Sequence, residues 1–322
     1  MTQMKLSKIL FTALAVCAIA AACKKEDDST TTYKSLSGTF SVGELPAFVN
    51  PGDEFDFVSE GLSFPEDETD ASLEIIYTYT NSEVSKTDTV STYHLVVPDI
   101  VGEFTLTAKA AATGYYTKTI TLTTTVVSDK SITGADKNSL AQQVDPRDNK
   151  HYHTVSINGQ RWFADNLAYF ETDDEGTYYF GRPYMEAKAA EDVFGGFYTW
   201  EEAKTACPAG WQLPSVEEWN AMGDQAGEMM CDAYYNGDRL WEFWPDVKVT
   251  NEKKFFAFPF GYATIVDGTY SFTGFNDYAF FWADNAGTPV CYYIYVAAPR
   301  INIWDNPSES DFAAQLRCVK SL

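Results

Sequence analysis

Histidine and basic residues are scarce in this chain of 322 residues. It contains three histidines, His94, His151 and His153, and 23 lysines and arginines against 46 aspartates and glutamates, for a net charge of −23. So few histidines argue against a hydrolytic triad, and none of the cysteines lies in a nucleophile signature. The acidic surface repels phosphate backbones, which makes nucleic acid a poor partner.

The N-terminal apolar run, Ile9–Ala22, follows Lys5 and Lys8 and is too short to span a bilayer comfortably. This pattern is typical of a signal peptide, which we expect over residues 1–22. Small residues then precede Cys23, and the segment resembles a bacterial lipobox. We therefore predict lipid attachment at Cys23, with an ordinary signal peptide cut nearby as the alternative.

A charged segment, Lys24-Lys25-Glu26-Asp27-Asp28, follows Cys23. It resembles the surface-export tag of Bacteroidetes lipoproteins, although a solvated charged tether gives the same composition. We expect a flexible lipidated tether over 23–33, since this stretch lacks an apolar pattern. The resemblance implies a protein anchored in the outer membrane and facing the cell exterior.

Four cysteines remain beyond the anchor: Cys207, Cys231, Cys291 and Cys318. An even number in an exported chain predicts disulfides, and three pairings are possible in principle.

About 300 residues remain after the signal peptide, which is more than one core usually holds, so we expect two domains. The first, over 34–127, is rich in Thr, Val, Tyr and Phe with period-two runs separated by turn residues. The strands that we expect are Leu73–Thr80, Thr92–Val97, Glu103–Ala108 and Thr117–Val127. This spacing predicts a β-sandwich.

Residues 97–107 resemble the corner before the penultimate strand of immunoglobulin-like domains, which implies an immunoglobulin-like sandwich. We expect it to act as a spacer that holds the rest of the chain away from the membrane, with a binding module as the alternative. Residues 128–144 are polar and weakly patterned, and we expect a linker there.

All eight tryptophans lie after residue 160. Thr199 with Glu202, and Ser215 with Glu218, fit the capping box and predict helices near 200–206 and 216–226. The strands that we expect in this half are Phe255–Tyr262, Tyr278–Trp282, Tyr292–Ala297 and Gln315–Val319. The C-terminal domain, 145–322, is thus predicted to be α+β.

Several motifs of this half occur in the order of a known family. They are Tyr152–Leu167 with its Asn158-Gly159-Gln160-Arg161-Trp162 core, Phe197–Trp200, Cys207-Pro208-Ala209-Gly210-Trp211-Gln212-Leu213-Pro214, Gly261-Tyr262, Phe281-Trp282 and Leu316–Lys320. Together they resemble the Fibrobacter succinogenes major paralogous domain over about 145–320. Asp165 stands where the family usually has glutamate, and Asn158 looks like an insertion of one residue.

The family resembles C-type lectin folds, so the resemblance implies a lectin-like domain. It also implies a disulfide between Cys207 and Cys318, the position of the first disulfide of that fold. Cys231–Cys291 is then the second pair, with free buried thiols as the alternative for both.

The stretch 212–219 also resembles part of the formylglycine-generating enzymes, which share the lectin-like fold. Those enzymes bind copper through a reactive cysteine pair, whereas the cysteines here are predicted to form disulfides. We therefore expect no enzymatic activity and no catalytic residue. A pocket that gathers Asp173, Asp305 or His151 would favour an enzyme instead.

Metal ligands are poorly represented in the sequence. His151 and His153 alternate along a predicted strand, but no third ligand is evident. The acidic run 171–176 offers oxygen ligands for calcium without the spacing of a helix-loop-helix site, so a solvated loop is favoured. Trp304-Asp305-Asn306 only distantly resembles the calcium motif of sugar-binding lectins. We expect no metal and no cofactor, with Ca²⁺ as the alternative.

Aromatic residues near turns are the remaining candidates, because exposed rings stack on sugars or anchor protein partners. The candidate ligand contacts are Trp241, Trp244, Tyr270, Tyr292, Trp304, Asp305 and Asn306. The sequence thus favours a recognition module that binds a host or dietary glycan or a protein through loops between about 225 and 310. A structural or accessory subunit of a surface assembly is the alternative.

Overall fold

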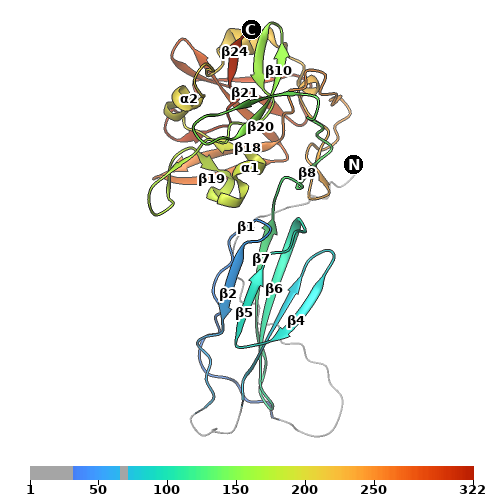
Figure 1. Ribbon diagram of the computed structural model, residues 1–322, viewed down its shortest axis with the longest axis vertical. Coiled ribbons are helices and arrows are strands. Elements are labelled where there is room, and N and C mark those ends of the chain that lie inside the picture. The colour runs from blue at the N-terminus through green and yellow to red at the C-terminus, as the bar shows by residue number, and fades with distance from the viewer. Residues whose placement is uncertain (1–31, 66–71) are drawn as a thin grey trace, which may run out of the picture. The chain divides into compact units, whose positions relative to one another are not determined.

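The computed structural model describes residues 32–65 and 72–322. The predicted signal peptide, Cys23 and nearly all of the tether 23–33 lie outside the described residues. The chain divides into two compact units, with the boundary along the sequence between Val126 and Val127 (Figure 1). Among the described residues, no helix is long and apolar enough to cross a membrane.

The regular elements of the first unit, over its described residues, are all strands. They are β1 (Phe48–Val49), β2 (Glu54–Val58), β3 (Glu74–Thr80), β4 (Ser85–Thr89), β5 (Thr92–Val96), β6 (Gly102–Ala111) and β7 (Lys118–Val126). One sheet has the order β1-β7-β6-β3-β4, and β2 pairs with β5 in a second sheet. The four strands expected from period-two runs correspond to β3, β5, β6 and β7.

Alternating side chains build the core of this unit. Tyr77 of β3 is fully buried, and its ring stacks on Tyr93 of β5 with centroids 5.1 Å apart. Its hydroxyl donates to the backbone oxygen of Phe57 in β2 over 3.2 Å. These contacts join the two sheets, because β3 belongs to one and β2 and β5 to the other.

The second unit contains seventeen strands and six short helices among the described residues. The strands are β8 (Ile132–Thr133), β9 (Ala141–Val144), β10 (His151–Ile157), β11 (Gln160–Phe163), β12 (Glu171–Thr172), β13 (Tyr178–Phe180), β14 (Arg182–Pro183), β15 (Gly196–Phe197), β16 (Tyr234–Tyr235), β17 (Asp238–Arg239), β18 (Phe260–Val266), β19 (Thr269–Phe275), β20 (Tyr278–Asn285), β21 (Thr288–Tyr295), β22 (Asn302–Asp305), β23 (Phe312–Ala313) and β24 (Val319–Ser321). The helices are η1 (Tyr184–Glu186), η2 (Lys188–Ala190), α1 (Glu191–Phe194), α2 (Trp200–Ala206), α3 (Val216–Ala221) and η3 (Ala226–Glu228).

Two sheets dominate this unit. The larger has the order β19-β18-β20-β21-β22, with β23 paired to β18, and the smaller has the order β24-β11-β10-β9. Figure 1 shows β18, β20 and β21 side by side, with α2 at their flank. The unit is therefore mostly β-sheet with a small helical part.

Both predicted capping boxes are confirmed. Thr199 and Glu202 cap α2, and Ser215 and Glu218 cap α3, each by two reciprocal hydrogen bonds. Helix α3 ends at Ala221 rather than near residue 226, because Gly223 follows with a positive φ of 86° that ends the helical conformation.

The predicted linker at 128–144 is wrong, because this segment belongs to the second unit. Ile132 in β8 lies opposite Tyr235 in β16, and β9 pairs with β10. Lys137 between them forms a partly buried ion pair with Asp165. The segment is polar because its short strands lie at sheet edges, where half of the side chains face water.

The C-terminal segment 312–320 connects the two sheets. Ala313 lies opposite Ala263 of β18, and Val319 pairs with Trp162 of β11. Between them, the backbone N–H of Phe163 donates to Cys318 O over 2.9 Å. In the last predicted strand, 315–319, Gln315 forms a single bridge to Phe281 and residues 316–318 are irregular, so regular pairing begins only at Val319 in β24.

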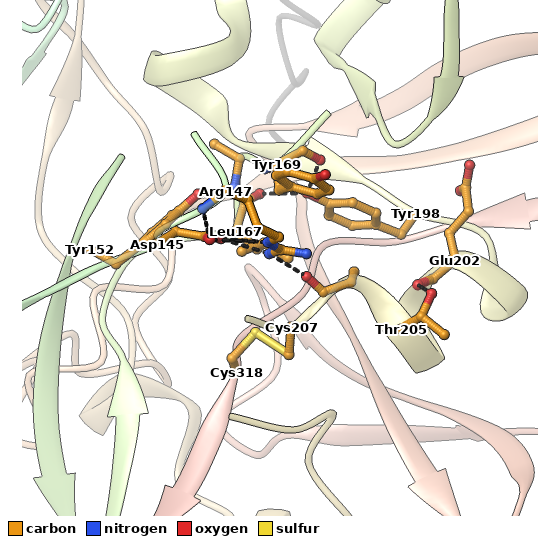
Figure 2. Close-up of a disulfide and its surroundings, with 12 residues drawn as sticks. Asp145, Arg147, Tyr152, Leu167, Tyr169, Tyr198, Glu202, Thr205, Cys207 and Cys318 are labelled. Carbon is orange, nitrogen blue, oxygen red and sulfur yellow. Dashed lines mark hydrogen bonds and ion pairs between the residues drawn. A yellow bond between two sulfur atoms is a disulfide. The ribbon is translucent and has the colours of Figure 1, made fainter. Parts of the chain in front are cut away.

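Cys207 and Cys318 form a disulfide with their Cα atoms 5.8 Å apart, which confirms the pairing implied by the family resemblance (Figure 2). The bond connects the end of α2 to the C-terminal segment. Beside it, the Arg147 guanidinium pairs with buried Asp145 and donates to Ala206 O over 2.7 Å. The C-terminal end of α2 is thus fixed both covalently and by a charged hydrogen bond.

The second predicted disulfide, Cys231–Cys291, is wrong, since both cysteines are free and buried. Cys291 on β21 packs in the core that contains Trp200. The backbone N–H of Cys231 instead donates to Ala257 O, and Ala257 belongs to the other core of the unit. The two thiols therefore lie in different surroundings, which the spacing of cysteines along the chain does not reveal.

Candidate functional site: an aromatic face on the large sheet

Two of the predicted ligand contacts are core residues. Trp241 is fully buried, and its indole N–H donates to Ala257 O over 3.0 Å. Tyr292 is 3% exposed and stacks on Trp219, with ring centroids 5.0 Å apart. Both predictions are wrong, because nearby turn residues indicate a loop but do not indicate on which side of it a ring lies.

Tyr270 and Trp244 remain at the surface but in separate places. Tyr270, on β19, is half-buried beneath the Arg182 guanidinium, which lies 5.0 Å from the ring centroid. Burial raises the pKa of Tyr270 to about 12. Trp244 is 37% exposed, in a loop beyond β17. Neither has a ring contact with Trp304.

The predicted set Trp304, Asp305 and Asn306 does not form one site. Trp304 and Asp305 are consecutive residues of β22, so their side chains leave opposite faces of the sheet. Trp304 packs on Phe312 with centroids 4.9 Å apart. Asn306 follows in a turn with a positive φ of 56°. Trp304 alone retains the surroundings expected of a ligand contact, with 41% of its surface exposed.

Trp304 instead shares a sheet face with four tyrosines that the sequence analysis did not select. We call this surface the aromatic face; its residues are Tyr262 of β18, Tyr278 of β20, Tyr293 and Tyr295 of β21, and Trp304 of β22. All four tyrosines are half-buried.

Cross-strand pairing produces this arrangement. Tyr278 lies opposite Tyr295 and Phe280 opposite Tyr293, and both pairs stack, with centroids 4.9 and 4.7 Å apart. Tyr262 packs on Phe280 from the other side, at 4.8 Å. The rings hold one another in place on neighbouring strands of one sheet, so the face is preorganised.

The hydroxyl groups of the aromatic face are available to a ligand. Among the hydrogen bonds of the described residues, none involves the hydroxyl of Tyr262, Tyr278, Tyr293 or Tyr295. Burial, together with the neighbouring Tyr295 and Asp277, raises the pKa of Tyr278. This hydroxyl is therefore protonated at neutral pH and can both donate and accept a hydrogen bond.

The segment that supplies the aromatic face is acidic. Residues 255–316 contain six acids and a single base, Arg300, which pairs with Asp224 over 2.7 Å. Asp277 and Asp311 are exposed and directly precede Tyr278 and Phe312. The face is thus apolar and rich in hydroxyl groups within a negative field, which disfavours anionic ligands.

A second candidate is a hollow of about 680 Å³, which Lys137, His153, Asp165 and Arg317 help to line. Asp165 accepts from Lys137 over 2.5 Å and from His153 Nδ1 over 2.9 Å. Burial alone would raise the pKa of Asp165, but Lys137 and His153 hold it well below its usual range.

Arg317 in the same hollow is fully buried and holds the fold together. Its guanidinium donates to Asn166 Oδ1 over 2.7 Å and to the backbone oxygens of Phe255 and Phe256 over 2.9 Å each. Lys137, Asp165 and Arg317 are thus engaged with other protein groups, which is typical of a structural network. Arg317 and Lys137 were not selected from the sequence, because local patterns do not reveal partners more than 25 residues away.

The predicted metal candidates are used in local contacts. Asp173 Oδ1, in the acidic run 171–176, accepts from the backbone N–H groups of Glu175 and Thr177. Glu171 accepts from the Tyr169 hydroxyl over 2.6 Å. Among the described residues, no group of three or more His, Cys, Asp or Glu could hold a metal ion. Of Asp173, Asp305 and His151, only His151 lines the hollow described above.

The family model for the Fibrobacter succinogenes major domain matches residues 155–320, about half of the chain. The chain therefore belongs to this family, as its motifs predicted. The match begins in β10 and ends in β24, so it includes the disulfide and the whole aromatic face. No curated protein and no solved structure matches the chain.

Proposed function

We propose that this protein is a non-enzymatic recognition module that binds uncharged glycans through its aromatic face. The observation that carries the proposal is the row of half-exposed rings from Tyr262 to Trp304, with unengaged hydroxyl groups. Aromatic side chains offer a flat apolar surface, and tyrosine adds a hydrogen-bonding group at its tip. Sugar rings present the same combination of apolar C–H faces and hydroxyl groups.

Rigidity supports this proposal. Binding costs little side-chain entropy at a tyrosine of the protein, because its side chain has only two rotatable bonds. Here the rings are already fixed by stacking, as in the Tyr278–Tyr295 pair. Binding would therefore require little reordering of the protein.

Charge narrows the ligand class. Arg300 is the only base in residues 255–316, the segment that supplies the aromatic face, and it is paired with Asp224, so this segment offers few cations to sulfate or carboxylate groups. Exposed acids such as Asp277 and Asp311 would repel them. Uncharged glycans are therefore favoured over sulfated or sialylated ones.

The remaining features belong to the same proposal. We infer that the first unit is an immunoglobulin-like spacer and that the second has a C-type-lectin-like fold. Lipid attachment at Cys23 would place the protein at the outer membrane, facing the cell exterior. The two-sheet architecture of the first unit and the Cys207–Cys318 bond of the second support the two fold assignments.

A glycan array probed with the purified full chain tests the proposal. We expect binding to uncharged glycans, loss of at least tenfold in affinity for Tyr293→Ser and Trp304→Ala, and little change for Trp244→Ala. Trp244 is a matched control because its exposure, 37%, is close to the 41% of Trp304. Binding only to sulfated glycans, or equal losses in all three variants, would overturn the proposal.

A structural subunit of a surface assembly is the second candidate. One observation favours it: strand β22 ends the large sheet with an edge that no described strand covers. Stable co-purification with other envelope proteins, without glycan affinity, would support this role.

A further inference from the structure

Strand β22 is the last strand of the large sheet, and it pairs with β21 on one side only. Which of its backbone groups face outward follows from the hydrogen-bond pattern. Antiparallel pairs alternate between bonded and non-bonded residues. The backbone N–H of Asn306 donates to Pro289 O, so this is a bonded pair, and the Trp304–Cys291 pair is bonded by the same alternation.

The β20–β21 pairing independently gives the same assignment of bonded and non-bonded residues. The backbone N–H of Val296 donates to Asp277 O, so the alternation directs the N–H and C=O of Tyr292 toward β20. Ile303, opposite Tyr292, therefore directs its own N–H and C=O away from the sheet. Asp305, two residues further on, does the same.

The edge is covered up to Ile301 and open beyond it. The outward N–H of Ile301 donates to Asp224 O over 2.7 Å, and Gln225 bridges to Arg300. Among the backbone hydrogen bonds of the described residues, none caps the outward groups of Ile303 or Asp305. Asp224 thus satisfies the outward N–H of Ile301, whereas the outward N–H and C=O groups of Ile303 and Asp305 stay uncapped.

Natural sheet edges are usually protected by lysine, proline, bulges or a covering segment. The four residues of β22 include no lysine or proline, and Ile303 and Trp304 are 50% and 41% exposed. An exposed apolar edge of this kind is a template for another extended chain.

A small hollow lies beside the open edge. It has a volume of about 290 Å³, and its lining includes Ile301, Ile303, Tyr292 and Asp224. Every second side chain of a strand added beside β22 would point to the side of the sheet on which this hollow lies. One apolar side chain of such a strand would meet the hollow.

Acidic side chains flank this side of the edge. Asp305 projects from the same face as Ile303, and Asp305 and Glu217 both lie close enough to Tyr292 to raise its pKa together with burial, the larger cause. The net charge of −23 opposes close approach of a second copy of the chain. A partner with basic side chains next to an apolar one complements this surface.

We propose that β22 is a docking edge for an extended, basic segment of a partner protein, which adds to the large sheet as a further strand. The outward N–H and C=O groups of Ile303 and Asp305 bind the backbone of that segment. An apolar side chain enters the hollow at Ile301 and Ile303, and basic side chains flank it near Asp305. This site differs from the aromatic face, so each can fail without the other.

A synthetic peptide tests this proposal with the purified full chain. The probe is a fluorescein-labelled Lys-Thr-Leu-Thr-Lys-Thr, which places its lysines and its leucine on one side when extended, and binding is followed by fluorescence anisotropy. We expect saturable binding that weakens at least tenfold when both lysines are replaced by glutamate. Backbone N-methylation on odd or on even residues should abolish binding in one set only, because alternate N–H groups face the edge.

Ile303→Pro removes one outward N–H without breaking the bonds to β21, whereas Ile303→Ala retains it. We expect a loss of at least tenfold for the proline variant and a smaller loss for the alanine variant, with both retaining glycan binding. Equal binding of both N-methylated peptides, or of the acidic peptide, would overturn the proposal. So would a dimer in sedimentation that Ile303→Pro dissociates, because it would assign the edge to a second copy.

Discussion

Trp304 and Asp305 are adjacent in β22, but they belong to different surfaces. Trp304 packs on Phe312 and completes the aromatic face, whereas Asp305 projects from the opposite face, on the side of Ile303 and the small hollow. This separation follows from the period of two along a strand. One short edge strand therefore contributes to two distinct candidate sites.

Substitution of buried Trp241 should mainly affect stability, whereas substitution of exposed Trp304 should mainly affect glycan binding. Trp241→Ala should destabilise the second unit by about 3–5 kcal/mol, because it leaves a cavity and removes the indole N–H that donates to Ala257 O. Trp304→Ala should reduce stability far less while it removes glycan binding. Urea unfolding of both variants measures the difference. A larger stability loss for Trp304→Ala would show that this residue is mainly structural.

Removal of the Cys207–Cys318 disulfide should destabilise the second unit. For a loop with a sequence separation of 111 residues, the chain-entropy model gives about 4–5 kcal/mol. A Cys207→Ser, Cys318→Ser double variant should therefore have a lower Tm than the parent chain. Peptide mapping by mass spectrometry without reduction should find this pair linked and Cys231 alkylated as a free thiol. A Cys231–Cys291 linked peptide would contradict the structure.

Arg317 should be among the most sensitive positions of the fold. Arg317→Leu removes donors from Asn166, Phe163, Phe255 and Phe256, all within the buried interior. The expected cost is about 3–5 kcal/mol, measured by urea unfolding. Arg300→Leu is the control, because its pair with Asp224 is exposed to solvent and contributes little to stability. Similar losses in the two variants would argue against a structural role for the buried guanidinium.

Asp165 should make stability depend on acid pH. Its pKa in the folded protein lies below the unfolded value of about 3.9. The stabilisation is therefore fully present above that value and is lost as the pH falls through the folded pKa. Asp165→Asn should lower stability at pH 7 and flatten the dependence between about pH 5 and 2. Unfolding of both chains across this range tests it, and identical slopes would contradict the assignment.

Local sequence signals predicted much of the scaffold. The capping boxes at Thr199 and Ser215 gave the helix starts, because capping depends on residues only three positions apart. Period-two runs gave β3 and β6, because alternation also depends on residues close together in the sequence. The pairing of Cys207 with Cys318 came from the family resemblance, since spacing alone allows three pairings among four cysteines.

The candidate site was harder to predict, because it depends on register between distant strands. Tyr278 and Tyr295 meet only because β20 and β21 pair in one register, and a shift by one residue would turn either ring to the core. The same limit explains the error at Tyr292 in β21, whereas Trp241 lies in a loop, where turn residues do not indicate which way a ring points. The alternation of aromatic residues, Tyr278 with Phe280 and Tyr293 with Tyr295, was the available signal for a shared face.

The most direct test of the central claim is a calorimetric titration of the full chain with the uncharged glycan that binds best on the array. We predict saturable binding by the parent chain and by the Trp244→Ala control. The Tyr293→Ser, Trp304→Ala double variant should lose binding by a hundredfold or more while its Tm stays within a few degrees of the parent. Unchanged affinity in the folded double variant would contradict recognition through the aromatic face.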